Sequence, residues 1–233
     1  MSDDLRGTNS GLKLIDLASI TVVAAILGAA LLVWQGAPTG PMPMHFNAAG
    51  QVDRWGDRDE MARFIGLMGL IAAGVAGYCL MFERYAKDPV GERFTYRLGR
   101  IVGLAAPGFV ALLMTLVAFD RLPAQGDDAP FMRVMMGGLA LLFLGLGAFL
   151  GRAKPNPVVG VRTYWSLRSR LAWDKSNRLA GRLFSLIGVA GLIAAPLAPL
   201  PFGFKAMMGA VILAALASAY ESWRVWRTDP ART

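Results

Sequence analysis

Long apolar runs, almost free of Asp, Glu, Lys and Arg, separate the charged parts of this chain and leave it few possible folds. A helix needs about 20 apolar residues to cross the hydrocarbon core of a bilayer. The first four runs of about this length are Leu17–Trp34, Phe64–Phe82, Ile101–Phe119 and Val134–Leu150. Only 17% of the residues are charged, against about 25% in soluble domains. The sequence therefore predicts an all-α membrane protein, and we expect the first run to be an uncleaved span.

Two further spans are expected in the stretch Leu183–Tyr220, whose only charged residue is Lys205. This stretch is too long for one crossing and long enough for two. A tight hairpin is predicted between them, marked by Pro196, Pro199, Pro201 and Gly203. The sixth span, Ala206–Tyr220, is short unless it includes Phe202–Phe204. The complete prediction is a bundle of six transmembrane helices, with a kink at Pro107 in the third.

Lysine and arginine are divided unequally between the two sides of this bundle. Eighteen lie in the two termini and the second-to-third and fourth-to-fifth connections, and six lie in the other connections. Because positive residues accumulate on the cytoplasmic side, we expect both termini in the cytoplasm. The expected regions are a cytoplasmic N-terminus, two spans with an outer loop, a basic loop with the third span, spans four to six, and a cytoplasmic tail: residues 1–16, 17–82, 83–133, 134–220 and 221–233.

Ionisable side chains are scarce inside the predicted spans. Asp16 and Asp120 lie at span ends, and Glu83 and Glu221 lie just beyond others. Proton-coupled pumps and ion carriers usually place such groups at mid-membrane depth. The sequence therefore argues against a transporter of that kind, although a path for a lipid or a peptide stays open.

Small residues in the spans have packing roles. The single cysteine, Cys79, excludes an internal disulfide and is expected to be a packed residue. Glycines permit close helix contact, and we expect those of the fourth span to pack within the bundle rather than in a dimer. They are Gly138, Gly145, Gly147 and Gly151.

The loop between the first two spans carries the only histidine, His45. An imidazole near Asp53 suits a pH sensor or one metal ligand, but a metal site needs three or four ligands. We therefore expect no metal site, and the favoured interpretation is a folded cap held by hydrogen bonds. The candidate recognition or cap residues are Pro43, His45, Asn47, Gly50, Asp53 and Trp55.

The connection between the fourth and fifth spans is the most polar part of the chain. From Arg152 to Arg182 it holds eight basic residues and one acidic residue. The proline-free part, Ser166–Arg182, predicts a helix with Ser166 as its cap and Gly181 near its end. On such a helix one face about 80° wide collects most of the charge; its members are Arg168, Leu171, Lys175, Arg178 and Arg182.

A cationic face of this kind suits anionic lipid headgroups or an acidic partner protein. The alternative is positive charge that only sets topology, but this does not account for the aromatic and amide residues nearby, which are Asn156, Trp165, Trp173 and Asn177. Direct nucleic-acid binding is not expected, because the segment is short and tethered to the membrane at both ends.

Two motifs resemble a known family. The inner residues Lys154-x-Asn156, Gly160-x-Arg162-Thr163-x-Trp165-x-Leu167, Trp173 and Asn177-Arg178 resemble the signature of the SdpI family of integral membrane immunity proteins. The outer residues Pro43-x-His45-x-Asn47-x-x-Gly50-x-x-Asp53-x-Trp55 resemble a domain of unknown function that often precedes that signature. Two positions depart from the usual pattern: Arg58 replaces lysine, and Asn177 stands where histidine is common.

The resemblance implies a protein of the bacterial cytoplasmic (inner) membrane that protects against a secreted peptide toxin. It also implies signalling, in which the toxin-engaged protein recruits a small repressor to the membrane. We expect no enzymatic activity and no cofactor; the implied partners are the lipid bilayer, the peptide outside and the repressor inside. The alternatives are a small transporter or lipid-handling protein, which needs a polar path, and a membrane enzyme, which needs converging catalytic groups.

Overall fold

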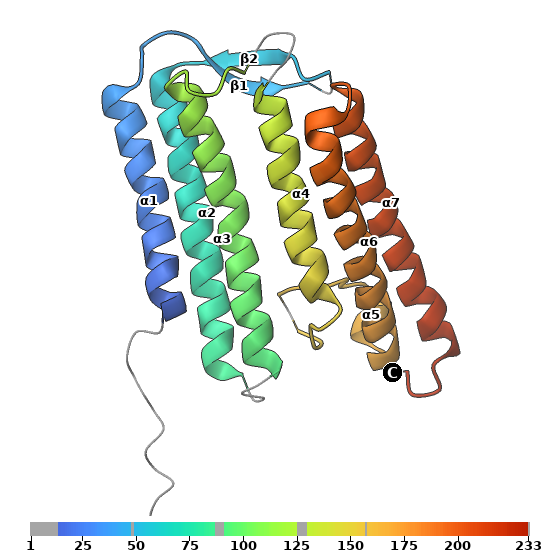
Figure 1. The fold of residues 1–233 in the computed structure, drawn as a ribbon. Coiled ribbons are helices and arrows are strands. Elements are labelled where there is room, and N and C mark those ends of the chain that lie inside the picture. Colours follow the sequence, from blue (N-terminus) through green and yellow to red (C-terminus); the bar gives the residue numbers. More distant parts are fainter. Residues whose placement is uncertain (1–13, 48, 87–90, 125–129, 157, 233) are drawn as a thin grey trace, which may run out of the picture.

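Six long helices stand side by side in the computed structural model, which describes residues 14–47, 49–86, 91–124, 130–156 and 158–232 (Figure 1). All six are long and apolar enough to cross a bilayer, which confirms the predicted membrane bundle. They are α1 (Leu14–Gly36), α2 (Arg58–Tyr85), α3 (Gly91–Ala118), α4 (Pro130–Leu150), α6 (Arg170–Leu197) and α7 (Phe202–Thr228). The chain adds a short helix α5 (Tyr164–Leu167) and two strands, β1 (Met42–Phe46) and β2 (Val52–Gly56).

The two ends of the bundle differ in chemistry. Helix α1 begins and α7 ends at the same end, where the connection after α4 also lies (Figure 1). We call this the basic end, because the lysines and arginines between residues 152 and 182 gather there. The two strands pair at the opposite end, which we call the hairpin end.

Several helices extend beyond the charge-free runs that predict them. Helix α3 begins at Gly91, ten residues before Ile101, and α7 continues to Thr228. The charged side chains at these ends are in contact with water or with an ionic partner, so the helix can continue past the apolar run. Helix α3 also continues through Pro107. The predicted hairpin between the last two spans is shorter than expected, because Pro196 lies within α6 and Gly203 within α7.

The predicted limits of the inner helix, Ser166–Arg182, are wrong. The structure breaks the segment between α5 and α6, and α6 then runs without interruption from the inner segment through the fifth span. Ser169 is the N-cap, and its Oγ accepts a hydrogen bond from the amide of Ala172 at 2.9 Å. Both serines are good caps by composition; the tertiary partners of Ser169 decide between them.

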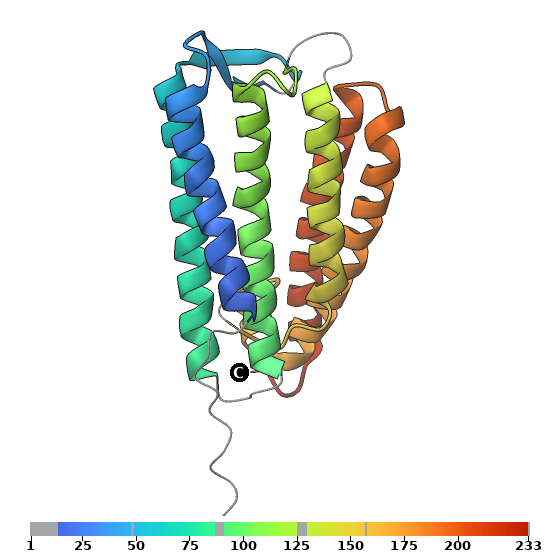
Figure 2. The same ribbon diagram turned by 60° about the vertical axis from the view of Figure 1, so that its left-hand side comes forward.

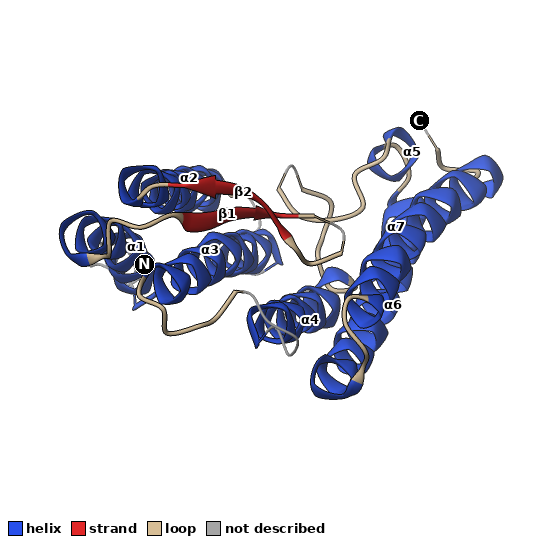
Figure 3. Cartoon of the chain, turned by 90° about the horizontal axis from the view of Figure 1, so that it is seen from above, coloured by secondary structure: helices blue, strands red, loops and turns tan. Residues whose placement is uncertain are grey.

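The bundle consists of two groups of three helices, α1–α3 and α4 with α6 and α7 (Figures 2 and 3). Glycine brings α4 and α6 together: a Cβ on Gly147 would lie 2.5 Å from the amide nitrogen of Ser185. Gly138 instead faces Phe109 of α3, whereas a Cβ on Gly145 would meet no atom of the described residues within 4 Å. A Cβ on Gly151 would lie 3.6 Å from Arg178 of α6. The expected intrachain packing is therefore confirmed for Gly138, Gly147 and Gly151 and wrong for Gly145.

The outer loop is an antiparallel hairpin that joins the two groups. Strands β1 and β2 pair with an irregularity between Pro43 and His45. The ring of Phe46 stacks on Phe131 of α4 at a centroid distance of 4.4 Å. A folded cap was predicted here, but β-strands were not, because the loop lacks the strict apolar alternation that marks a strand.

Candidate functional site

The turn of the hairpin depends on the predicted residues Asn47 and Gly50. The side-chain oxygen of Asn47 accepts hydrogen bonds from the amides of Ala49 at 2.8 Å and Gln51 at 3.1 Å. Gly50 has a φ of +77°, a conformation in which a side chain is strained. These two residues shape the loop from within.

The exposed face of the hairpin carries the other predicted residues. The Nδ1 atom of His45 lies 2.6 Å from a carboxylate oxygen of Asp53, with the two side chains 65% and 41% exposed. Pro43 pairs across the hairpin with Trp55, which is also exposed. His45, Asp53 and Trp55 therefore form a solvent-facing patch, which we call the hairpin patch.

At the basic end, the side chain of Asn156 organises the connection that follows α4. Its oxygen accepts hydrogen bonds from the amides of Val158 and Val159, both at 2.7 Å. Its nitrogen donates to the carbonyls of Lys154 at 2.7 Å and Val159 at 2.8 Å. Since a primary amide offers about four such bonds, the buried Asn156 is fully used in holding this loop.

Two buried residues of α6 anchor the same loop. Trp173 donates from Nε1 to the carbonyl of Ala153 at 2.7 Å, and the oxygen of Asn177 accepts from the amide of Val161 at 2.8 Å. Gly160, with a φ of +136°, lies directly on both side chains. A Cβ at this position would stand 2.7 Å from Trp173 and 2.8 Å from Asn177, so only glycine fits.

A hydroxyl network continues this framework to α7. Thr163 and Ser166 form a capping box at the start of α5, in which each side chain bonds to the backbone of the other residue. The Thr163 hydroxyl also lies 2.7 Å from that of Ser222 on α7. Thr163 thus links the loop to α5 and to α7.

The predicted inner residues therefore separate into two sets. We call the first the anchoring framework: Asn156, Gly160, Thr163, Trp173 and Asn177. The predicted cationic face is exposed and includes further arginines, and we call it the basic surface: Lys154, Arg162, Arg168, Arg170, Lys175, Arg178 and Arg182. Leu167 is exposed beside it, and Trp165 is half-buried. Trp173 and Asn177 are buried beneath the basic surface and are not part of it.

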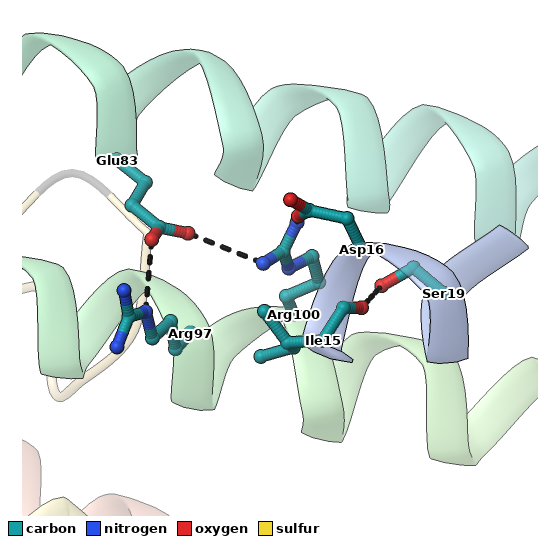
Figure 4. Close-up of polar contacts among 6 residues, drawn as sticks. All are labelled: Ile15, Asp16, Ser19, Glu83, Arg97 and Arg100. Carbon is teal, nitrogen blue, oxygen red and sulfur yellow. Dashed lines mark hydrogen bonds and ion pairs between the residues drawn. The ribbon is translucent and has the colours of Figure 1, made fainter. Parts of the chain in front are cut away.

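An ionic cluster at the basic end of α1–α3 was missed by sequence reasoning. Arg100, only 1% exposed, pairs with Asp16 at 2.7 Å and with Glu83 at 3.2 Å (Figure 4). Glu83 also accepts a hydrogen bond from Arg97 at 2.8 Å. In the sequence these residues look like separate span-end charges. The spacing of Arg97 and Arg100, which places both on one helical face, is the only local signal of the cluster.

The inner loop also contacts the first group of helices. A Cβ on Gly99 of α3 would meet Val159 at 2.8 Å and Val158 at 3.2 Å. The tip that Asn156 shapes therefore fits against α3, next to Arg100. The two helix groups are joined at the basic end by this loop and at the hairpin end by Phe46.

A buried carboxylate connects the C-terminal end to the start of α6. The cap residue Ser169 donates its hydroxyl hydrogen to Asp229, which follows α7. This bond, and then the amide of Ala231, lower the pKa of Asp229 below its ordinary value of 3.8. The contact is therefore complete above the ordinary pKa and is lost as the pH falls through the lowered one.

We expect Asp229→Asn to increase amide hydrogen exchange at the start of α6 at pH 7. Because protonation removes the same charge, the difference between variant and wild type should diminish at a pH well below the ordinary carboxylate pKa of 3.8. Hydrogen exchange measured at both pH values checks this. Equal exchange of the two proteins at pH 7 would show that the contact does not support the cap.

Comparison with known families agrees with this arrangement. Residues 152–221 match the SdpI/YfhL protein family, from the inner loop into α7. Residues 20–70, which contain the hairpin, match the Domain of unknown function (DUF1648). The resemblance and the order of the two regions are thereby confirmed.

The SdpI/YfhL match begins after α4, so it contains the whole anchoring framework and the whole basic surface. No curated protein and no solved structure matches the chain. The SdpI match, together with the six apolar helices, supports a multi-pass membrane protein of the immunity type in general.

Proposed function

We propose that this chain is a non-enzymatic immunity and signalling protein of the bacterial cytoplasmic membrane. Its hairpin patch meets a secreted membrane-active peptide, and its basic surface meets an acidic face of a cytoplasmic repressor. The observation that carries the proposal is the separation of roles at the basic end. A buried framework held by internal hydrogen bonds presents a set of exposed cations beside the membrane.

The charge distribution supports the orientation that this function needs. With the basic end in the cytoplasm, the bundle follows the positive-inside rule, and the hairpin patch lies outside. Exposed arginines are suited to a protein partner, because their planar guanidinium groups bind carboxylates with two parallel hydrogen bonds. The family match supports immunity in the general sense.

The junctions between the helix groups supply a route between the two surfaces. The hairpin touches α4 through Phe46, and α4 leads directly into the loop that Asn156 shapes. A peptide that displaces the hairpin would thus alter the contact between α3 and α4. That displacement would reach the loop tip against Gly99 and, through it, the basic surface.

The test is expression of the chain in a bacterial strain sensitive to a panel of membrane-active peptides. We expect survival to rise at least about tenfold for one peptide. A His45→Ala, Asp53→Ala double variant should lose this protection. An Arg162→Ala, Arg178→Ala double variant should keep it and lose co-purification of a cytoplasmic protein.

Membrane levels of each variant, measured by immunoblot, serve as the control. The four substituted residues are all exposed, so the bundle should assemble normally. Absence of protection against every peptide at a normal membrane level would refute the proposed function.

A further inference from the structure

A groove separates α1 and α2 in the half of the bundle nearer the basic end. The two helices touch at Gly69, where a Cβ would lie 2.6 Å from Leu27. Toward the basic end they separate, leaving a cavity of about 620 Å³. Its walls are formed by α1 between Asp16 and Leu27, by α2 between Ala73 and Arg84, and by Arg100 of α3.

The lining changes in character along the groove. From Leu27 to Ile20 on α1, and from Ala73 to Leu80 on α2, the lining is apolar. At the basic end it becomes charged, with Arg84, Arg100 and Asp16. Since both helices span the membrane, this pattern follows the profile of a lipid, with hydrocarbon toward the centre and a polar group at the interface.

The buried Arg100 has a nitrogen that lacks a hydrogen-bond acceptor. Its terminal nitrogens pair with Asp16 and Glu83 (Figure 4). Its Nε is buried and has no acceptor among the described residues. An unsatisfied buried donor is costly, and one on a charged group more so, so a ligand oxygen that reaches Nε after a shift of the Arg100 side chain would be favoured.

The charge around this end of the groove selects the sign of that ligand. Among the described residues at this end, three arginines, at positions 84, 97 and 100, lie near two carboxylates, Asp16 and Glu83, which leaves one positive charge in excess. Arg84 is exposed, and no carboxylate of the described residues forms an ion pair with it. An anionic headgroup therefore complements the site better than a zwitterionic one, whose net charge is zero.

We propose that the groove binds one anionic phospholipid from the leaflet at the basic end. Its phosphate lies at Arg84 and Arg100, and one acyl chain lies between α1 and α2. A soluble phosphate would leave the apolar walls unoccupied, whereas a lipid fills both parts. The bound lipid would hold α1 against α2, next to the ionic cluster of α3.

Two glycines of α2 provide a matched test. A Cβ on Gly77, which lines the groove, meets no described atom within 4 Å, and neither does a Cβ on Gly74, which lies outside it. Leucine at position 77 therefore fills the acyl-chain space without disturbing the bundle. Leucine at position 74 makes the same chemical change on the same helix.

The experiment measures lipid retained by the purified full chain in native mass spectrometry, with phosphatidylglycerol or phosphatidylcholine added. We expect wild type and Gly74→Leu to retain one phosphatidylglycerol, and Gly77→Leu to retain about tenfold less. Arg84→Gln should reduce the preference for phosphatidylglycerol by about tenfold, because it removes a charge-assisted hydrogen bond.

Each other result overturns the proposal. Equal retention by the two leucine variants would place the lipid elsewhere. Equal retention of the two lipids by wild type would show a binding site without the proposed charge selectivity. Retention of free inorganic phosphate in place of the lipid would identify a soluble anion as the ligand.

Discussion

Replacing Gly188 with alanine is expected to destabilise the bundle by about 2 kcal/mol net. Alanine favours a helix over glycine by about 1 kcal/mol, so the sign depends on the space available. A Cβ at this position would stand 2.6 Å from the amide nitrogen of Leu144 and 2.7 Å from the carbonyl of Ala140. Both atoms belong to the backbone of α4, so relief requires the helices to move apart, and overpacking of this kind costs about 1–3 kcal/mol or more.

The matched control is Gly145→Ala on α4. Its Cβ would meet no atom of the described residues within 4 Å, so the change should be neutral or slightly stabilising. Unfolding by titration with a denaturing detergent, followed by circular dichroism, compares the two variants. Equal stability of Gly188→Ala and Gly145→Ala would show that α4 and α6 are farther apart than the structure has them.

Trp173→Ala should have a still larger effect, about 3–5 kcal/mol, which is the usual cost of removing a fully buried tryptophan. The ring is completely buried and fills the space against Gly160. Its loss also leaves the carbonyl of Ala153 without the indole donor. We expect the inner loop to detach from α6 and trypsin to cleave rapidly after Arg162 and Arg168.

Trp34→Ala makes the same substitution at a position that is 52% exposed, and its effect should be about 0.5 kcal/mol. The rate of trypsin cleavage and the thermal midpoint are measured for both variants. If Trp173→Ala is cleaved no faster than Trp34→Ala, the loop is not anchored by the indole.

Hydropathy was sufficient to predict the six spans, because the cost of placing charge in hydrocarbon exceeds most local preferences. The run Val134–Leu150 lies entirely within α4, for example. Helix limits were less predictable. Arg97 and Arg100 lie inside α3 because acidic partners from two other helices balance their charge.

The sequence predicted which residues belong to the candidate site, but not how they are arranged in space. The residue types in the inner motif indicated a functional segment and its resemblance to a family. Whether Asn177 faces a partner or the interior was not predictable, because Asn177 and Arg178 are adjacent and their roles depend on which face of α6 meets the loop. The break before Ser169 likewise depends on Asp229, sixty residues away.

The sequence by itself determined the membrane as solvent, the number of helices and the end of the bundle at which positive charge gathers. These features follow from the free energies of transferring each residue from water into the membrane, summed along a segment, and do not depend on which residues lie beside it in the fold. Only the tertiary structure decided which inner residues are buried anchors and which are exposed cations. It also showed that Arg100, Asp16 and Glu83 form one cluster. The physical reason is that hydrogen bonds and ion pairs depend on distances between helices, which no single segment encodes.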